Sequence, residues 1–279
     1  MNVTKGLPVN DEGLESKIEA AKIHISNYLS YNKDKNTDLS KISSFEFGAG
    51  YDLIVPLIFS FMKIKKIYCV DIKYKISAFL INDIIERLKI NSEFMYLISE
   101  SKLNSEITPS NLTKILEEKY NIFYKAPMDA ASTNLQDESI DLIVSNATLE
   151  HIPLDSIKAI LKESYRILKP GGIMSHAIDY KDHWAYIDGN LSYYDFLKYN
   201  EKKWEYKNPS LNYQNRLRHK DYLDLFIKAG FQIEYAKLDF PSTNDNYVLR
   251  ELKLNDYFKS NYTFDELSLL GCFFVLSKL

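Results

Sequence analysis

The chain has 279 residues and a formal charge of −3 at neutral pH. Hydrophobic residues make up 46% and charged residues 26%, a balance that excludes a disordered chain, a collagen-like chain and a disulfide-stapled miniprotein. With a pI near 6.0, the chain lacks the basic field that holds a phosphate backbone. We therefore expect no nucleic acid among its partners.

The cysteines and the apolar stretches indicate the compartment. Cys69 and Cys272 lie far apart, each in an apolar run, which predicts buried free thiols in a reducing environment. The polar N-terminus MNVTKGLPVNDEG lacks the apolar core of a signal peptide. The longest apolar stretches, YDLIVPLIFSFM and LSLLGCFFVL, are too short to span a bilayer. We expect a cytoplasmic protein with no membrane partner.

The periodicity of apolar residues predicts the elements in chain order. Apolar residues from Leu14 to Leu29 recur at helical spacing, which predicts an opening amphipathic helix. After a polar loop, strands alternate with helices. Strands are expected at ISSFEFGAG, KIYCVDI, IFYKAP, SIDLIVSNA, GGIMSHAID, FQIEYAKLDF and GCFFVLSKL. Further helices are expected over residues 52–63, with Asp52 as the cap, and over 74–89, 110–120, 155–168 and 220–229. Residues 169–172 are predicted to form the turn that closes helix 155–168.

This alternation is typical of a parallel sheet covered by helices on both faces. Right-handed crossovers make such a sheet doubly wound, so the sequence predicts a Rossmann-like α/β fold. In that fold the ligand crevice lies at the carboxyl ends of the strands. Residues 180–215 break the rhythm and hold both tryptophans and seven of the 21 tyrosines. They form either a surface subdomain with its own small core or a substrate lid.

The first candidate binding motif is Glu46-Phe47-Gly48-Ala49-Gly50, at a strand-to-helix turn. Glycines let the backbone turn tightly and admit a ligand, while the helix start offers free N–H groups. Leu53 stands at the last glycine position of the dinucleotide pattern G-x-G-x-x-G. The motif therefore fits pyrophosphate badly and fits better a cationic amino-acid moiety beside a carboxylate. A purely structural turn is the alternative.

Three further motifs follow later strands. Asp71 ends the second strand, where its carboxylate either accepts both ribose hydroxyls or caps the next helix. Asp129, after the third strand, could read an adenine edge together with a backbone N–H. The stretch IDLIVSNATLEHIP brings Asn146, Glu150 and His151 to the same sheet edge. We expect His151 to be structural.

With EFGAG, VDI, PMDA, SIDLIVSNATLEHI and LKPGGIM in this order, the chain resembles class I S-adenosylmethionine-dependent methyltransferases that act on small molecules, over roughly residues 43–180. The resemblance implies a seven-stranded, mostly parallel sheet whose last strand is antiparallel. It implies S-adenosylmethionine as cofactor and S-adenosylhomocysteine as product. Asp52 departs from the family pattern, in which many members carry a small residue there.

The resemblance also implies a set of cofactor contacts. Gly48 and Gly50 would approach the methionine part, supported by Glu46. The remaining contacts are Asp71 with the ribose hydroxyls, Ile72 beside the adenine, Asp129 and Ala130 on the adenine, and Asn146 near the methionine end. The chain then divides into an N-terminal helical cap (1–42), a cofactor-binding core (43–180), an aromatic lid insertion (181–218) and a C-terminal part that completes the sheet (219–279).

The stretch HAIDYKDHW, at the end of the fifth strand, supplies candidates for acceptor chemistry. His183 is the first candidate for a general base because it lies beyond the strand, and Asp179 could orient its ring. His176 is a second candidate, although a histidine packed in the core is the favoured alternative. The two His and two Asp of this stretch, which include Asp182, could also bind a divalent metal, but nothing in the sequence fixes their geometry.

These motifs predict transfer of a methyl group to an oxygen of a small polar acceptor that carries a saccharide or a phosphate. Arg216 and Arg218 could clamp an anion, although arginines at a surface are usually only solvated. The segment from Asp179 onward resembles, more loosely, bacterial methyltransferases of surface-polysaccharide biosynthesis. The alternatives are a nitrogen acceptor, a non-catalytic cofactor-binding module that acts through a partner, and a nicotinamide-dependent oxidoreductase, which Leu53 disfavours. The sequence leaves the oligomeric state open.

Overall fold

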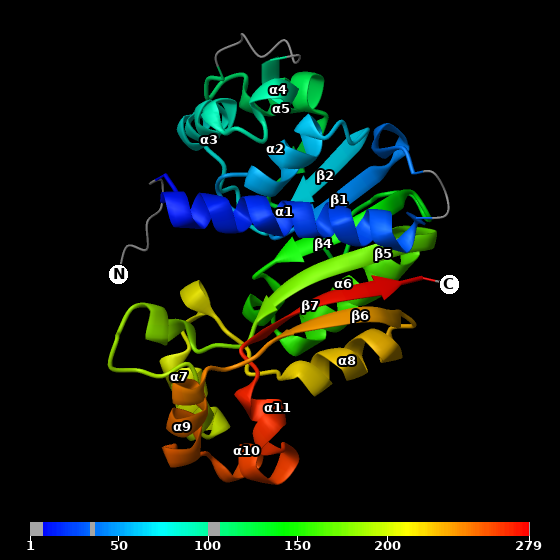
Figure 1. The fold of residues 1–279 in the computed structure, drawn as a ribbon. Helices are drawn as coiled ribbons and strands as arrows, with labels where there is room; N and C mark the ends of the chain where they lie inside the picture. Colours follow the sequence, from blue (N-terminus) through cyan, green and yellow to red (C-terminus); the bar gives the residue numbers. More distant parts are fainter. Residues whose placement is uncertain (1–7, 34–36, 100–106, 279) are drawn as a thin grey trace. The chain divides into compact units, whose positions relative to one another are not determined.

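The computed structural model describes residues 8–33, 37–99 and 107–278, which form two compact units (Figure 1). Unit 1 comprises residues 1–145 and 166–175, and unit 2 comprises residues 146–165 and 176–279. The seven-stranded sheet has the order β3-β2-β1-β4-β5-β7-β6. Its strands are β1 (Ser43–Phe47), β2 (Lys66–Val70), β3 (Ile122–Lys125), β4 (Ile140–Asn146), β5 (Leu168–Asp179), β6 (Gln232–Asp239) and β7 (Gly271–Ser277).

Helices lie between most successive strands, and each helix that the sequence predicts is present. The helices are α1 (Asp11–Tyr31), α2 (Ile54–Phe61), α3 (Ala78–Ile90), α4 (Met95–Ser99), α5 (Leu112–Tyr120), α6 (Leu154–Ile167), α7 (Glu201–Lys207), α8 (His219–Lys228), α9 (Thr243–Glu251), α10 (Asp256–Asn261) and α11 (Phe264–Ser268). Strand β1 pairs in parallel with β2 and β4, and β2 with β3, whereas β6 and β7 are antiparallel. The predicted mostly parallel α/β sheet is confirmed.

In unit 1, apolar burial holds the helices on the sheet. Strands β1 and β4 are buried along nearly their whole length, and seven of the eight residues of α2 are buried. Helix α1 packs against α2, and α5 packs against β3. The imidazole of His24, fully buried in α1, lies 2.7 Å from the hydroxyl of Ser175 in β5. Cys69 in β2 is a buried free thiol, as predicted, and so is Cys272 in unit 2.

Three predicted boundaries are wrong, each for a local reason. Helix α3 begins at Ala78 and not near residue 74, because the hydroxyl of Ser77 caps it by accepting the N–H of Leu80. Leu53, in a left-handed conformation, precedes α2; Asp52 accepts the N–H of Ile54 only at 3.3 Å. The expected turn at residues 169–172 lies within β5, which already begins at Leu168.

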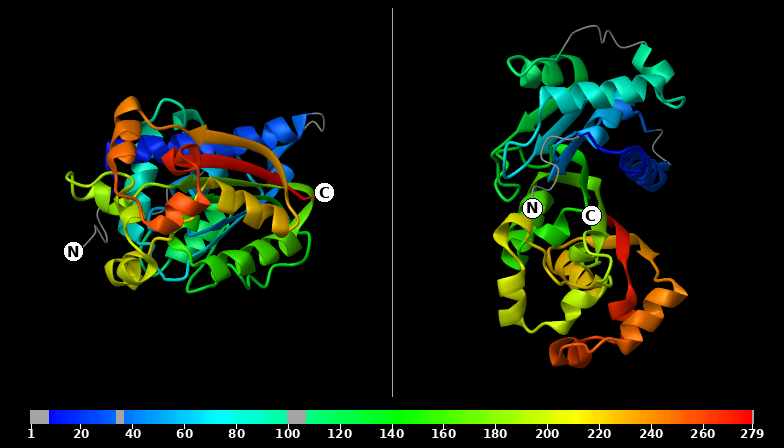
Figure 2. Two further views of the ribbon diagram at one scale, coloured as in Figure 1. Left: turned by 90° about the horizontal axis from the view of Figure 1, so that it is seen from below. Right: turned by 90° about the vertical axis from the view of Figure 1, so that its left-hand side faces the viewer.

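Unit 2 contains a second core that the sequence did not predict as a whole. Helices α9, α10 and α11, absent from the predicted elements, lie between β6 and β7 in the chain (orange to red in Figure 2), and their buried residues pack with those of the aromatic segment. The buried side chains of this core are Tyr194, Phe196, Leu197, Trp204, Leu249, Phe258, Leu267 and Leu270. The aromatic segment therefore helps to build a small core of its own. Its role as a lid stays a prediction.

No helix among the described residues has the length and apolar character needed to cross a membrane.

Candidate functional site

The glycine turn in unit 1 forms as the sequence predicts. Gly48 and Gly50 adopt positive φ values of 71° and 72°, a conformation that costs glycine little. The N–H of Gly48 donates to the carbonyl of Val70 at 3.0 Å, which fixes the turn to the end of β2. A Cβ at Gly50 would have only the carbonyl oxygen of Gly48 within 4.0 Å, so open space lies beside this position. A ligand can approach the backbone there.

Asp71 and the glycine turn lie in direct contact. Asp71 is only 3% exposed, and its Oδ2 accepts the N–H of Gly50 at 3.2 Å. The same oxygen pairs with Nζ of Lys75 at 3.1 Å, and Oδ1 accepts the N–H of Lys73 at 3.0 Å. A carboxylate has about four lone-pair sites, so Oδ1 can still accept a hydroxyl, and Oδ2 can do so once Lys75 moves away. The residues present therefore fit a ribose.

The other predicted cofactor contacts differ in exposure. Glu46 is buried in β1, where its charge adds to burial in raising the pKa of the Cys69 thiol. Ile72 is 62% exposed, as a residue beside a bound ring must be before binding. Asp129 is exposed and its Oδ1 accepts the N–H of Ala131, while Ala130 is buried. Their roles stay predictions.

The chain near the glycine turn also borders a cavity in unit 1. The cavity has a volume of about 400 Å³, and its lining includes Val9, Tyr51, Asp52 and Asp83. Nζ of Lys17 in α1 lies 2.5 Å from Oδ2 of Asp52, so the first helix is tied to the turn. Leu53, which stands at the last glycine position of the dinucleotide motif, is fully buried, so it packs in the core of unit 1.

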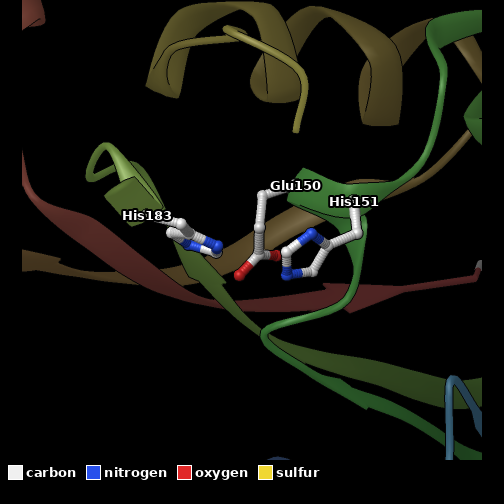
Figure 3. Close-up of side chains that lie close together, drawn as sticks. All are labelled: Glu150, His151 and His183. Atoms are coloured by element: carbon white, nitrogen blue, oxygen red, sulfur yellow. The ribbon is translucent and has the colours of Figure 1, made fainter. Parts of the chain in front are cut away.

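A separate polar cluster lies in unit 2, where the chain leaves β4 and β5. Glu150 and His151 belong to a 3-10 turn after β4, and His183 begins another after β5. Figure 3 shows the three side chains pointing toward one another. One ligand-type atom from each lies within 4.8 Å of the others, and the two imidazole rings are 4.7 Å apart. We call this set the Glu150–His151–His183 cluster. Asn146, at the end of β4, is half-buried near the start of this segment of the chain.

Glu150 is a buried carboxyl group. It is 1% exposed, and burial raises its pKa well above the usual range. Its Oε1 accepts the N–H of Asp179 at 3.3 Å. The neighbouring backbone is fixed because Asn215 donates its side-chain amide to the carbonyls of Leu149 and Ile152. These hydrogen bonds hold the turn that carries Glu150 and His151.

The structure brings the predicted pair Asp179 and His183 together. Oδ2 of Asp179 lies 3.4 Å from Nε2 of His183 and accepts the hydroxyl of Tyr186 at 2.5 Å. Burial alone would raise the pKa of Asp179, but its contacts with His183 and Tyr186 and the charge of Lys181 outweigh burial and lower it. The backbone N–H of His183 donates to Oε1 of Gln214. The role of His183 as a base stays a prediction.

The remaining polar candidates of this region, His176 and Asp182, are buried in unit 2, and the role of His176 as a base stays a prediction. His176 is fully buried in β5, where it stacks on Phe226 with ring centroids 6.1 Å apart. Asp182 is 2% exposed and caps the turn at His183 by accepting the N–H of Trp184. The favoured alternative for His176, a histidine packed in the core, describes its position.

The predicted anion clamp is wrong. Arg218 is fully buried and donates to the carbonyls of Tyr180, Leu267 and Leu269 at 2.6–2.8 Å. Arg216 donates to two backbone carbonyls and pairs with Glu201. Both guanidinium groups are committed to the protein's own backbone, so neither is available to hold a phosphate.

The sequence analysis placed Glu150 and His151 at the correct sheet edge but gave them no chemical role. It sought a metal site within HAIDYKDHW alone, and only His183 of that stretch belongs to the observed cluster. The signal that could have found the cluster was the pair Glu150-His151 directly after a strand end, opposite the end of the next strand. Among the described residues, Glu150, His151 and His183 are the group whose atoms lie close enough together to hold a metal ion. The binding of a metal stays a prediction.

Comparisons with known proteins agree with this fold. A family model described as "Methyltransferase domain" matches residues 103–175. No curated protein matches the chain. The magnesium protoporphyrin IX methyltransferase of Synechocystis PCC 6803, solved with bound SAH, is 11% identical, with 98% of this chain and 89% of that chain covered and a TM-score of 0.51.

Two further structures are similar. The geranyl diphosphate C-methyltransferase of Streptomyces coelicolor A3(2), in complex with Mg²⁺, geranyl diphosphate and S-adenosyl-L-homocysteine, is 10% identical, with 100% and 88% covered and a TM-score of 0.50. A geranyl diphosphate methyltransferase in complex with GPP and sinefungin is 10% identical, with 94% and 78% covered and a TM-score of 0.53. These likenesses show the α/β fold of S-adenosylmethionine-dependent methyltransferases. The family match supports a methyltransferase, as the motifs predict.

Proposed function

We propose that this protein transfers a methyl group from S-adenosylmethionine to a hydroxyl oxygen of a small polar acceptor of the saccharide class. The observation that carries the proposal is the contact between Gly50 and Asp71. It joins a glycine turn with open space to a buried carboxylate that retains acceptor capacity for a ribose. Asp71 and the turn are the cofactor side of the proposal, and both belong to unit 1.

The chemistry asks little of the protein. When bound, S-adenosylmethionine supplies a methyl group already activated on a sulfonium. The carbon–sulfur bond breaks as the carbon–oxygen bond forms, the sulfur keeps the electron pair as a thioether, and the acceptor hydroxyl loses its proton. The chain must therefore align the acceptor, exclude water and ease that proton loss.

The choice of a saccharide acceptor is supported by groups within unit 2, taken by themselves. The Glu150–His151–His183 cluster offers polar groups that can bind a hydroxyl. Tyr186 is 56% exposed, and its ring centroid lies 5.5 Å from that of His183, so an aromatic face suited to a sugar lies next to the cluster. Because Arg216 and Arg218 are committed to backbone carbonyls, a phosphate on the acceptor is not part of the proposal.

The test is transfer of a labelled methyl group from S-adenosylmethionine to a panel of free sugars and sugar nucleotides, with amines as a second panel. We expect a labelled product that is a methyl ether by NMR, and we expect His183→Ala to abolish its formation without weakening cofactor binding. A matched control is His219→Ala, which alters a half-buried histidine of α8 outside the cluster. Label found only on amines would contradict the oxygen assignment.

A non-catalytic module is the competing proposal. It predicts cofactor binding with no transfer to any member of either panel. The buried carboxyl group of Glu150 argues against it, since a buried group of this kind is costly to keep without a use.

A further inference from the structure

The Glu150–His151–His183 cluster combines two imidazoles and one carboxylate. These come from two segments that are remote in the sequence, the turn after β4 and the turn after β5. One ligand-type atom from each side chain lies within 4.8 Å of the other two. As Figure 3 shows, the carboxylate lies between the two rings.

An independent observation points to a bound partner at this place. Oε2 of Glu150 is buried and, within the described residues, has no hydrogen-bond partner, although the side chain is only 1% exposed. Buried polar atoms in native proteins almost always have a partner, and a bound cation can satisfy a carboxylate oxygen that no protein donor reaches. The carboxylate belongs to the group of side chains that could surround a cation.

The tautomer of His151 is also suited to this purpose. Nδ1 of His151 lies 2.8 Å from the carbonyl oxygen of Tyr213. A carbonyl only accepts, so Nδ1 carries the hydrogen, and in the neutral ring Nε2 is then the nitrogen with the lone pair. Histidines that bind metals almost always have their second ring nitrogen fixed in this way. A protein-internal hydrogen bond therefore prepares His151 as a ligand.

We propose that Glu150, His151 and His183 bind a divalent transition-metal ion, with zinc as the best fit. Imidazole nitrogens suit zinc and its neighbours, whereas Mg²⁺ and Ca²⁺ prefer oxygen ligands alone. Bonds of about 2.1 Å set tetrahedral ligands roughly 3.4 Å apart, whereas the three atoms lie within 4.8 Å of one another. Each pair must therefore close by up to about 1.4 Å, which rotamer changes can supply. Three protein ligands leave a position open.

The role of the ion rests on the proposed function. An acceptor hydroxyl in the open position would lose its proton more readily, since a bound cation stabilises the alkoxide charge. His183 then acts as a ligand and not as the base that the sequence predicts.

The experiment measures metal binding without cofactor or acceptor. The full-length chain is stripped with a chelator and titrated with Zn²⁺ by calorimetry and with Co²⁺ by visible absorption. We expect one ion per chain with a dissociation constant in the micromolar range or below, and a Co²⁺ spectrum of low-coordinate type. Glu150→Gln and His151→Gln should each weaken binding at least tenfold, while His219→Gln should bind as wild type does. Thermal unfolding of the stripped variants establishes that each is folded.

Three outcomes would overturn the inference: no binding of either ion, equal binding by all variants, or binding of Mg²⁺ as tight as that of Zn²⁺. Failure here is distinguishable from failure of the proposed function. A chain that transfers methyl groups but binds no ion keeps the function and loses the metal site. A chain that binds zinc through these residues but transfers no methyl group keeps the site and loses the function.

Discussion

Replacing Arg218 with methionine tests whether the buried guanidinium group stabilises the fold of unit 2. Its guanidinium donates three hydrogen bonds to the carbonyls of Tyr180, Leu267 and Leu269, and its Cζ lies 5.3 Å from the centroid of the Tyr180 ring. Hydrogen bonds to a charged group contribute roughly 1.5–3 kcal/mol each, offset in part by the cost of burying the charge. We expect Arg218→Met to lower the free energy of unfolding by about 3–5 kcal/mol.

The assay is thermal unfolding followed by circular dichroism. At roughly 2 °C per kcal/mol for a chain of this size, the midpoint should fall by about 6–10 °C. Arg218→Lys keeps the charge but not the planar guanidinium group, so its unfolding midpoint should lie between those of the wild type and Arg218→Met. Lys228→Met is the control, because its ion pair with Asp224 is exposed on both sides. A midpoint for Arg218→Met within about 2 °C of that control would refute the structural role of the guanidinium.

Three further predictions follow from single contacts. Lys75→Met should tighten S-adenosylmethionine binding by about fivefold, since about 1 kcal/mol of ion pairing with Asp71 no longer has to be broken. The pKa of Asp195 is lowered: burial alone would raise it, but the hydrogen bonds from Lys198 and Ser192 outweigh burial. Asp195→Asn should therefore cost about 1–2 kcal/mol near neutral pH, a cost that shrinks as the pH falls below about 4. Gly271→Ala should cost about 1–3 kcal/mol, because its Cβ would lie 2.9 Å from a carbonyl oxygen of β5.

Each of these has its own measurement and contrary result. Calorimetry measures the affinity of the Lys75 variant for S-adenosylmethionine. An affinity weaker than that of the wild type would mean that Lys75 itself contacts the cofactor and would contradict the argument. The Asp195 variant is compared with the wild type by urea unfolding at a series of pH values. A carboxyl group whose pKa is lowered in the folded state stabilises that state above the unfolded-state pKa, and this stabilisation is lost on acidification. A difference in the free energy of unfolding that does not change with pH would contradict the argument. Gly189→Ala, which has nothing within 4 Å, is the control for Gly271. Equal midpoints for the two would contradict the predicted clash.

The parts of the site that the sequence could predict are those built by local chemistry. Gly48 and Gly50 follow a strand and need positive φ, and Asp71 ends the neighbouring strand, so their contact follows from the order of parallel strands. The pairing of Asp179 with His183 also depends on only a short stretch of chain. The strands themselves were also predictable, because buried strands are continuous apolar runs in the sequence.

The parts that could not be predicted depend on how remote segments meet. His151 points its Nδ1 at the carbonyl of Tyr213, a residue 62 positions away, and no periodicity encodes that contact. From the sequence, Arg218 is indistinguishable from a surface arginine; in the structure it donates to the carbonyls of residues 267 and 269. Helices α9 to α11 are short and mostly polar, so their apolar residues, such as Leu249 and Phe258, give no clear helical pattern. Tertiary packing decided each of these.

The most direct test of the central claim is calorimetric titration of the chain with S-adenosylmethionine and S-adenosylhomocysteine, repeated with Asp71→Ala. We predict micromolar binding of both ligands that weakens at least tenfold in the variant, because two ribose hydroxyls lose a charged acceptor worth about 1.5–3 kcal/mol per hydrogen bond. Asp137→Ala, which removes an exposed carboxylate elsewhere in unit 1, should bind as wild type does. Absence of binding by either ligand, or equal binding by Asp71→Ala, would mean that the glycine turn is structural and would contradict the proposed function.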